Sequence, residues 1–170
     1  MKKHNLVIFT GVDATGKSTI ADKVKEKFKL PLFHMDKVGS EIEGNMVNYY
    51  FMKCINQDMI LDRYYMEEVV YAPIYRGYKA SYIEELEREL LKKFNVILIY
   101  TTAATEVIKQ RFNDRGEDFT NPEDIEMLKR NYMDFMNDTL IKNKFIVDTS
   151  NGLSKEDENR LMEDLRLCLN

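Results

Sequence analysis

The sequence predicts an α/β fold of three layers, in which helices cover both faces of a five-stranded parallel sheet. Five short apolar runs typical of buried strands recur along the chain, at residues 6–9, 29–34, 59–62, 96–100 and 145–148. Segments with the apolar spacing of helices lie between these runs, beginning with residues 19–28. This alternation favours a parallel sheet, and ligands of such sheets bind at the carboxyl ends of the strands.

Three further helices have recognisable start signals. Ser81 opens a capping-box pattern, Asn121 precedes a proline and is a candidate N-cap, and Ser154 opens the last helix. The acidic run at residues 84–87 is interpreted as a solvated helix face. The apolar faces of the three helices are expected at Ile83, Leu86, Leu90 and Leu91, at Ile125, Leu128, Tyr132 and Phe135, and at Leu161 and Leu165.

The composition limits the class of protein. We expect one domain over residues 1–170, because this length suffices for one sizeable core. The net charge of −4 argues against a broad basic face for duplex nucleic acid. Apolar runs are too short for a membrane span or a signal peptide, so we expect a cytoplasmic protein, as a monomer or a homodimer. Cys54 and Cys168 lack metal-ligand spacing and are predicted to be free, buried thiols.

Residues 11–18 have the sequence GVDATGKS, which matches the pattern G-x-x-x-x-G-K-[ST] of a phosphate-binding loop. The strand before it and the helix after it are the setting that this loop requires. Its glycines permit a tight turn, and its N–H groups form an anion-binding concavity at a helix N-terminus. The predicted nucleotide-binding residues are Gly11, Asp13, Ala14, Thr15, Gly16, Lys17, Ser18 and Thr19.

Two side chains of this loop have predicted roles. Lys17 would reach the β- and γ-phosphates, and the Ser18 hydroxyl would ligate Mg²⁺. We expect Lys17 to be exposed while no nucleotide is bound, because its role is to interact with the negative charge of the phosphates and not to pack in the core. The alternative is a turn with a solvated lysine, which the flanking strand and helix disfavour.

Asp62 and Arg63 follow the third predicted strand, at the sheet edge where ligands bind. A carboxylate there can hold Mg²⁺ or orient an attacking oxygen, and an arginine fork can bind a substrate phosphate. The alternative is a strand-end aspartate that caps the next helix beside a solvated arginine. Next to a phosphate loop, the functional interpretation is favoured.

Arg111 and Arg115 are four residues apart and therefore share one helix face, just before Gly116. Phosphoryl transfer spreads negative charge over the moving group, and an arginine delivered by a closing lid stabilises that charge. The alternative is the modest benefit of cations at a helix C-terminus. We favour a lid at about residues 112–121, with both arginines catalytic.

With these motifs, the chain resembles the thymidylate kinases, and more closely their compact virus-encoded deoxynucleotide kinase relatives. The segments that carry the resemblance are distributed along the whole chain, at residues 9–19, 61–64 (LDRY), 70–77 (VYAPIYRG), 111–119 and 145–150. The resemblance implies a P-loop nucleoside-monophosphate-kinase-like fold with a lid. It also implies ATP-dependent, Mg²⁺-dependent phosphorylation of a deoxynucleoside monophosphate, with dTMP as the acceptor.

The resemblance also implies roles for single residues. Asp13 is similar to a carboxylate that contacts the acceptor 3′-hydroxyl, and Arg63 to an arginine on the acceptor phosphate. Tyr71 resembles an aromatic residue that disfavours a 2′-hydroxyl, and Arg76 belongs to the same substrate-side segment. Some members carry a catalytic arginine in the loop. Ala14 stands there in this chain, so the catalytic set becomes Lys17, Asp62, Arg111 and Arg115.

One departure and three alternatives accompany this interpretation. Thymidylate kinases usually carry Arg-Glu-Pro-Gly after the second strand, where this chain has residues 34–37 (HMDK). The sequence therefore does not determine which base the acceptor nucleotide carries. His34 is compatible with a packed, a solvated or a ligand-contacting histidine.

A deoxynucleoside kinase is the first alternative. That family typically has Glu-Arg-Ser where this chain has residues 62–64 (DRY), which weighs against it. The second alternative is a kinase that acts on a modified base or an end within DNA, and the net negative charge of the chain disfavours it. A guanine-binding switch would need Asn-Lys-x-Asp, which residues 143–146 (NKFI) do not supply.

Overall fold

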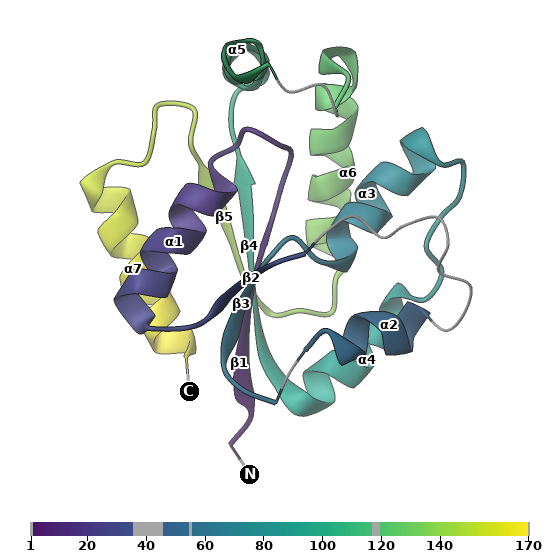
Figure 1. The fold of residues 1–170 in the computed structure, drawn as a ribbon, viewed down its shortest axis with the longest axis vertical. Coiled ribbons are helices and arrows are strands. Elements are labelled where there is room, and N and C mark those ends of the chain that lie inside the picture. Colours follow the sequence, from purple (N-terminus) through teal and green to yellow (C-terminus); the bar gives the residue numbers. More distant parts are fainter. Residues whose placement is uncertain (1, 36–45, 55, 117–119, 170) are drawn as a thin grey trace.

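A computed structural model describes residues 2–35, 46–54, 56–116 and 120–169 of the chain. Five strands form one parallel sheet in the order β2-β3-β1-β4-β5 (Figure 1). This confirms the predicted α/β fold with a five-stranded parallel sheet. The strands are β1 (His4–Thr10), β2 (Leu32–His34), β3 (Met59–Asp62), β4 (Phe94–Thr102) and β5 (Asn143–Asp148).

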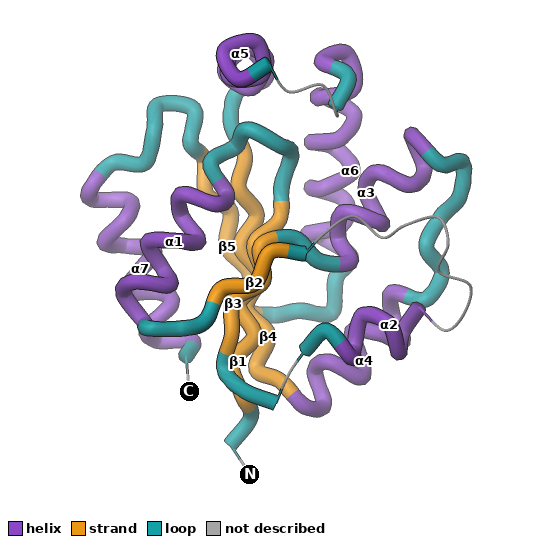
Figure 2. The backbone as a smooth tube through the Cα atoms, viewed as in Figure 1, coloured by secondary structure: helices purple, strands orange, loops and turns teal. Residues whose placement is uncertain are grey.

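Helices cover both faces of the sheet, as predicted, and the three layers are visible in Figure 2. One face is covered by α1 (Lys17–Phe28) and α7 (Lys155–Cys168). The other is covered by α2 (Met46–Met52), α3 (Tyr65–Tyr75), α4 (Ile83–Lys93) and α6 (Ile125–Asp138). Helix α5 (Thr105–Arg115) lies beyond the carboxyl ends of the strands, and a short 3₁₀ helix, Pro122–Asp124, precedes α6.

The central strand β1 contributes side chains to two hydrophobic cores, one on each face of the sheet. Its side chains alternate between the two faces, as the pleat of a strand requires. Leu6 and Ile8 pack in the core under α3, α4 and α6, whereas Val7 and Phe9 pack in the core under α1 and α7. All four are fully buried, so the unbroken apolar run is a strand covered on both faces.

The predicted element starts are partly confirmed. The Ser154 hydroxyl accepts a hydrogen bond from the Asp157 N–H at 3.0 Å, and the Asn121 side chain accepts one from Glu123 N–H at 3.1 Å. The capping box expected at Ser81 is wrong, because α4 begins at Ile83 after Tyr82 and no side chain caps it. The strand expected at 29–34 is shorter, because residue 29 ends α1 in the left-handed conformation.

Two burial predictions also need correction. Cys54 and Cys168 are free, as predicted, but half-buried, and burial raises the pKa of the Cys54 thiol to about 11. Glu87 is not on a solvated face but is buried, where it accepts hydrogen bonds from the Tyr65 hydroxyl and from the Thr139 hydroxyl. Within the described ranges, no helix is both long and apolar enough to cross a bilayer.

Candidate active site

The phosphate loop joins β1 to α1 at the carboxyl edge of the sheet, and its backbone conformation requires glycine. Gly11 has φ +143°, and a Cβ there would collide with the carbonyl oxygen of Thr101 on the neighbouring strand β4. Gly16 caps α1 with φ +83°, and Ala14 adopts a left-handed φ of +62°. The glycines of the motif therefore serve a close approach and a tight turn in this chain.

Lys17 is held inside the loop. Its Nζ donates to the carbonyl oxygens of Gly11 at 2.7 Å and Val12 at 3.1 Å, and lies 3.8 Å from Asp13 Oδ1. The side chain is only 6% exposed, and burial lowers the pKa of its ammonium. The expectation of an exposed lysine is wrong, because the first carbonyls of the loop already supply acceptors for it.

The structure brings Ser18 and Asp62, the two predicted metal ligands, into contact. The Ser18 hydroxyl donates to Asp62 Oδ2 at 2.8 Å, and His34 Nδ1 lies 3.3 Å from the same oxygen. The other oxygen, Oδ1, is buried and has no hydrogen-bond partner within the described part of the chain. An orphaned carboxylate oxygen beside a hydroxyl fits Mg²⁺, which prefers hard oxygen ligands and completes its shell with water and phosphate oxygens.

Arg63 lies beside the phosphate loop, where its Nη2 donates to Asp13 Oδ1 at 2.5 Å. Its backbone is left-handed, with φ +70°, and its N–H donates to the carbonyl of Phe9 at 3.0 Å. A left-handed non-glycine residue costs about 1–2 kcal/mol. The sharp turn after β3 is thus strained, and it directs the arginine toward the loop.

Glu67 lies near Lys17 in the candidate site, and the sequence did not single it out. Its carboxylate accepts hydrogen bonds from the Thr10 hydroxyl at 3.0 Å and from Tyr64 N–H at 2.9 Å, so it caps the start of α3. Burial raises the pKa of this carboxyl, and the Lys17 charge counters that effect. The sequence signal was a capping-box glutamate, which is hard to recognise because tyrosine and not serine or threonine stands at its N-cap.

Tyr71 and Arg76, on and after α3, have different surroundings. The Tyr71 ring stacks on Tyr75 at 5.9 Å, and burial, with the nearby Asp13 charge second, raises the pKa of its hydroxyl. Arg76 makes two hydrogen bonds to the buried Glu68 carboxylate, at 2.8 and 2.6 Å. Its described contacts are therefore with Glu68 and not with the phosphate loop.

Arg111 reaches from α5 to the phosphate loop. Its Nη1 donates to the carbonyl of Ala14 and to the hydroxyl of Thr149, both at 3.1 Å, and its Nη2 donates to the Thr149 carbonyl at 2.6 Å. Arg115 is exposed one turn later, where α5 ends at Gly116 with φ +67°. Of the predicted lid at 112–121, residues 117–119 lie outside the described residues.

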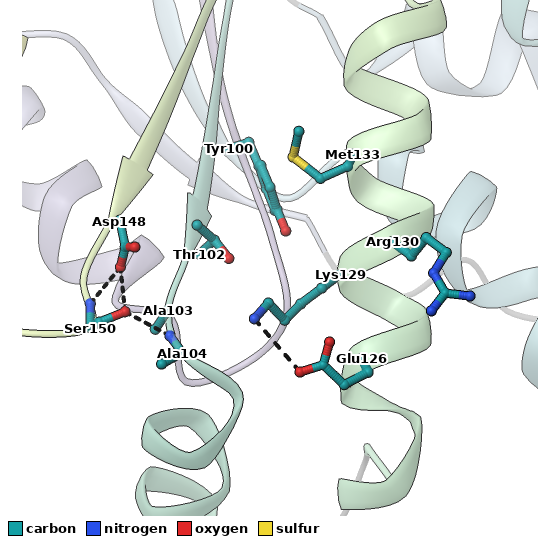
Figure 3. A pocket seen from close by; sticks show the side chains of 10 residues that line it. All are labelled: Tyr100, Thr102, Ala103, Ala104, Glu126, Lys129, Arg130, Met133, Asp148 and Ser150. Atoms are coloured by element: carbon teal, nitrogen blue, oxygen red, sulfur yellow. Dashed lines mark hydrogen bonds and ion pairs between the residues drawn. The ribbon is translucent and has the colours of Figure 1, made fainter.

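A pocket of about 460 Å³ adjoins this region, between the carboxyl ends of β4 and β5, the start of α5 and helix α6 (Figure 3). On its wall, the Ser150 hydroxyl accepts a hydrogen bond from Ala104 N–H at 2.7 Å. Asp148 Oδ1 accepts from Ser150 N–H at 2.7 Å and from its hydroxyl at 2.5 Å, and these bonds lower the pKa of Asp148. The turn after β5 is thereby fastened to the beginning of α5.

Comparisons with known proteins agree with this architecture. No protein-family model matches the chain. A prophage-derived protein of Bacillus subtilis, YorR, is 29% identical over 140 residues, which cover 77% of this chain and 81% of YorR. A probable thymidylate kinase of Methanococcus aeolicus is 23% identical over 192 aligned positions, covering 95% of this chain and 96% of that protein.

Solved structures resemble the chain more closely in fold than in sequence. The crystal structure of YorR in complex with phosphorylated GDP superimposes with a TM-score of 0.74 at 23% identity, covering 96% of this chain and 94% of YorR. Deoxyadenosine kinase from M. mycoides with bound dATP gives a TM-score of 0.63 at 20% identity, covering 95% and 99% of the two chains. The chain therefore has the P-loop fold of the thymidylate and nucleotide kinases.

Proposed function

We propose that this protein transfers a phosphoryl group from ATP to a deoxynucleoside monophosphate, with dTMP as the first acceptor. The observation that carries this proposal is the position of Arg63. A strained turn directs its guanidinium to the phosphate loop, 2.5 Å from Asp13, where an acceptor phosphate would meet the donor. Backbone strain of this kind clusters at active sites and ligand-binding turns.

On the donor side, the loop amides and Lys17 bind the ATP phosphates. The negative charge of those phosphates compensates an ammonium whose pKa burial has lowered. Ser18 and Asp62 are the residues that would hold Mg²⁺, which supplies charge neutralisation for the transferred group. In this proposal Asp62 also orients the attacking oxygen of the acceptor.

On the acceptor side, Arg63 binds the phosphate and Asp13 contacts the 3′-hydroxyl. Tyr71 lies against the sugar, and Arg76 lies further along the same wall, where its pairing with Glu68 leaves it about a third exposed. During transfer, Arg115 is the arginine that closes on the migrating group. Arg111 already donates hydrogen bonds to the carbonyls of Ala14 and Thr149, so in this proposal it supports the phosphate loop that binds the donor.

The proposal also includes the identity of the base that the acceptor nucleotide carries. The thymidylate kinase likeness supports thymine, whereas the YorR complex contains phosphorylated GDP. A deoxynucleoside kinase is the second candidate. It is favoured by the fold likeness to deoxyadenosine kinase and by one contact, since Asp13 already neutralises the arginine that an acceptor phosphate would need.

A coupled assay of ADP release tests the reaction class. It uses ATP, Mg²⁺ and a panel of all four deoxynucleosides and their monophosphates, with Lys17→Ala as the inactive control. The proposal predicts ADP release that depends on a monophosphate acceptor and is absent in the control. Release without any acceptor would favour a nucleotide-dependent switch, and release with nucleosides alone would favour the second candidate.

A further inference from the structure

We infer that Thr149 and Ser150, in the turn after β5, are positioning residues that hold the phosphate loop and helix α5 in one fixed arrangement. This inference rests on the proposed function, because it assumes that the loop binds a nucleotide. Neither residue belongs to the phosphate-loop motif or to the catalytic set. Their role follows from what their atoms contact.

Thr149 connects three elements. It is buried, its N–H donates to the Thr102 carbonyl at 2.8 Å, and its hydroxyl lies 2.9 Å from the Thr15 carbonyl and 3.2 Å from that of Thr102. The same hydroxyl accepts from Arg111 Nη1 at 3.1 Å. A hydroxyl has one proton to donate and two lone pairs to accept with. It can therefore serve the phosphate loop and Arg111 at the same time.

These contacts orient the amides of the phosphate loop. The carbonyl of Ala14 points to Arg111 and that of Thr15 points to Thr149. In a planar trans peptide, the N–H of the next residue points opposite to the carbonyl. Fixing these two carbonyls outward therefore turns the N–H groups of Thr15 and Gly16 inward, where a phosphate would accept from them.

Ser150 fastens the other end of the same unit. Its hydroxyl accepts from the N–H of Ala104, the N-cap residue of α5, while Asp148 holds that hydroxyl in place (Figure 3). Helix α5 is thus held at its start by Ser150 and in its middle by Arg111 and Thr149. Arg115 lies one helical turn beyond Arg111, at the other end of α5 from Ser150.

The test measures ADP binding by calorimetry, because binding does not depend on which acceptor the protein uses. Thr149→Val keeps the shape of the side chain and removes the hydroxyl, and Thr149→Ser retains the hydroxyl. We expect Thr149→Val to raise the Kd for ADP about tenfold, as loss of one hydrogen bond of about 1.4 kcal/mol would. Thr149→Ser should stay within about threefold of the wild type.

A matched control separates positioning from general destabilisation. Ser154→Ala removes the N-cap of α7 and none of the hydrogen bonds that Thr149 makes with the phosphate loop, so it should lower Tm without changing the Kd for ADP. Arg111→Ala combined with Thr149→Val should raise Kd by less than the product of the two single effects, because the two side chains share one hydrogen bond although each also holds its own loop carbonyl. The proposal predicts this non-additivity even if both variants also lower Tm.

The outcomes are distinct. A folded Thr149→Val variant with unchanged ADP affinity, or an additive double variant, would overturn the inference and leave the proposed function intact. A wild type that binds ADP but phosphorylates no deoxynucleotide would overturn the acceptor assignment, while the expected loss of affinity in Thr149→Val would still support the inference. A wild type that fails to bind ADP would overturn both.

Discussion

Arg63 and Asp13 form an ion pair of 2.5 Å that joins the end of β3 to the phosphate loop. Asp13 also lies 3.8 Å from the ammonium of Lys17, so one carboxylate faces two cations. An acceptor phosphate that binds Arg63 must therefore share this arginine with Asp13 or displace it.

Arg63→Ala should impair acceptor use selectively. A hydrogen bond to a charged group contributes about 1.5–3 kcal/mol, so kcat/KM for the monophosphate should fall on the order of 10–100-fold. The KM for ATP should change little, because Lys17 and the loop amides bind the donor. Arg63→Lys is the control that keeps the charge without the fork, and it should recover only part of the loss. An equal loss for ATP would contradict the assignment.

Lys17→Met should abolish turnover without lowering Tm. Burial lowers the pKa of Lys17, so its charge destabilises the folded state at neutral pH. By linkage, this penalty declines as pH rises from the folded to the unfolded pKa, and Met removes it at every pH. Circular dichroism and turnover measured together provide the check. Lys25→Met, exposed on the same helix, is the control that should retain activity. A folded, active Lys17→Met variant would refute the phosphate-loop assignment.

Arg115→Ala should lower kcat on the order of 10²–10³-fold while the KM for ATP stays within a few-fold. An arginine that contacts the migrating phosphoryl group acts mainly in the transition state. Steady-state kinetics with saturating acceptor provide the measurement, and Arg166→Ala, exposed on α7, is the surface control. If kcat is unchanged and only affinity falls, α5 carries a binding clamp and not a catalytic arginine.

Tyr71→Phe and Tyr71→Ala should relax discrimination against ribonucleotides. The ring is stacked on Tyr75 and lies edge-on to Tyr132 at 6.4 Å, so its position is well determined. A ring against the sugar leaves a 2′-hydroxyl without space or hydrogen-bond partners. The measured quantity is the ratio of kcat/KM for deoxy and ribo acceptors. A ratio that neither variant alters would remove Tyr71 from the site.

Glu87→Ala should destabilise the fold by about 2–4 kcal/mol. It removes the buried acceptor of the Tyr65 hydroxyl, the Thr139 hydroxyl and Leu140 N–H, and leaves these donors unpaired. Chemical denaturation gives the free energy of unfolding. Glu85→Ala, exposed on the same helix, should change it by less than about 0.5 kcal/mol. Equal effects of the two variants would contradict the structural role of Glu87.

The sequence was sufficient for those features that depend on local pattern. The apolar runs of β1 and β4 are buried on both faces, and a strand of that kind can be recognised without its neighbours. The phosphate loop is likewise a local motif, and its glycines adopt the positive φ that the motif requires. Ser18 and Asp62 could be paired because the carboxyl ends of parallel strands meet.

Features that depend on contacts between distant segments could not be predicted. His34 reaches Asp62 only because β2 pairs with β3 in the register that places these two residues side by side. Glu87 is buried by Tyr65 from α3 and by the turn after α6, and neither is visible from the helical pattern of α4. Helix α2 was missed because its aromatic run has no clear helical period.

The most direct test of the proposed reaction is the wild-type preference between a monophosphate and its nucleoside. With ATP and Mg²⁺, kcat/KM is measured for dTMP, dGMP, thymidine and deoxyguanosine under the same conditions. Because a phosphate can share or replace the contact of Arg63 with Asp13 and a nucleoside cannot, the monophosphate should be preferred by at least about tenfold for the accepted base. A preference for dGMP over dTMP would keep the reaction and change the base. Equal or better turnover of a nucleoside would contradict the proposed function.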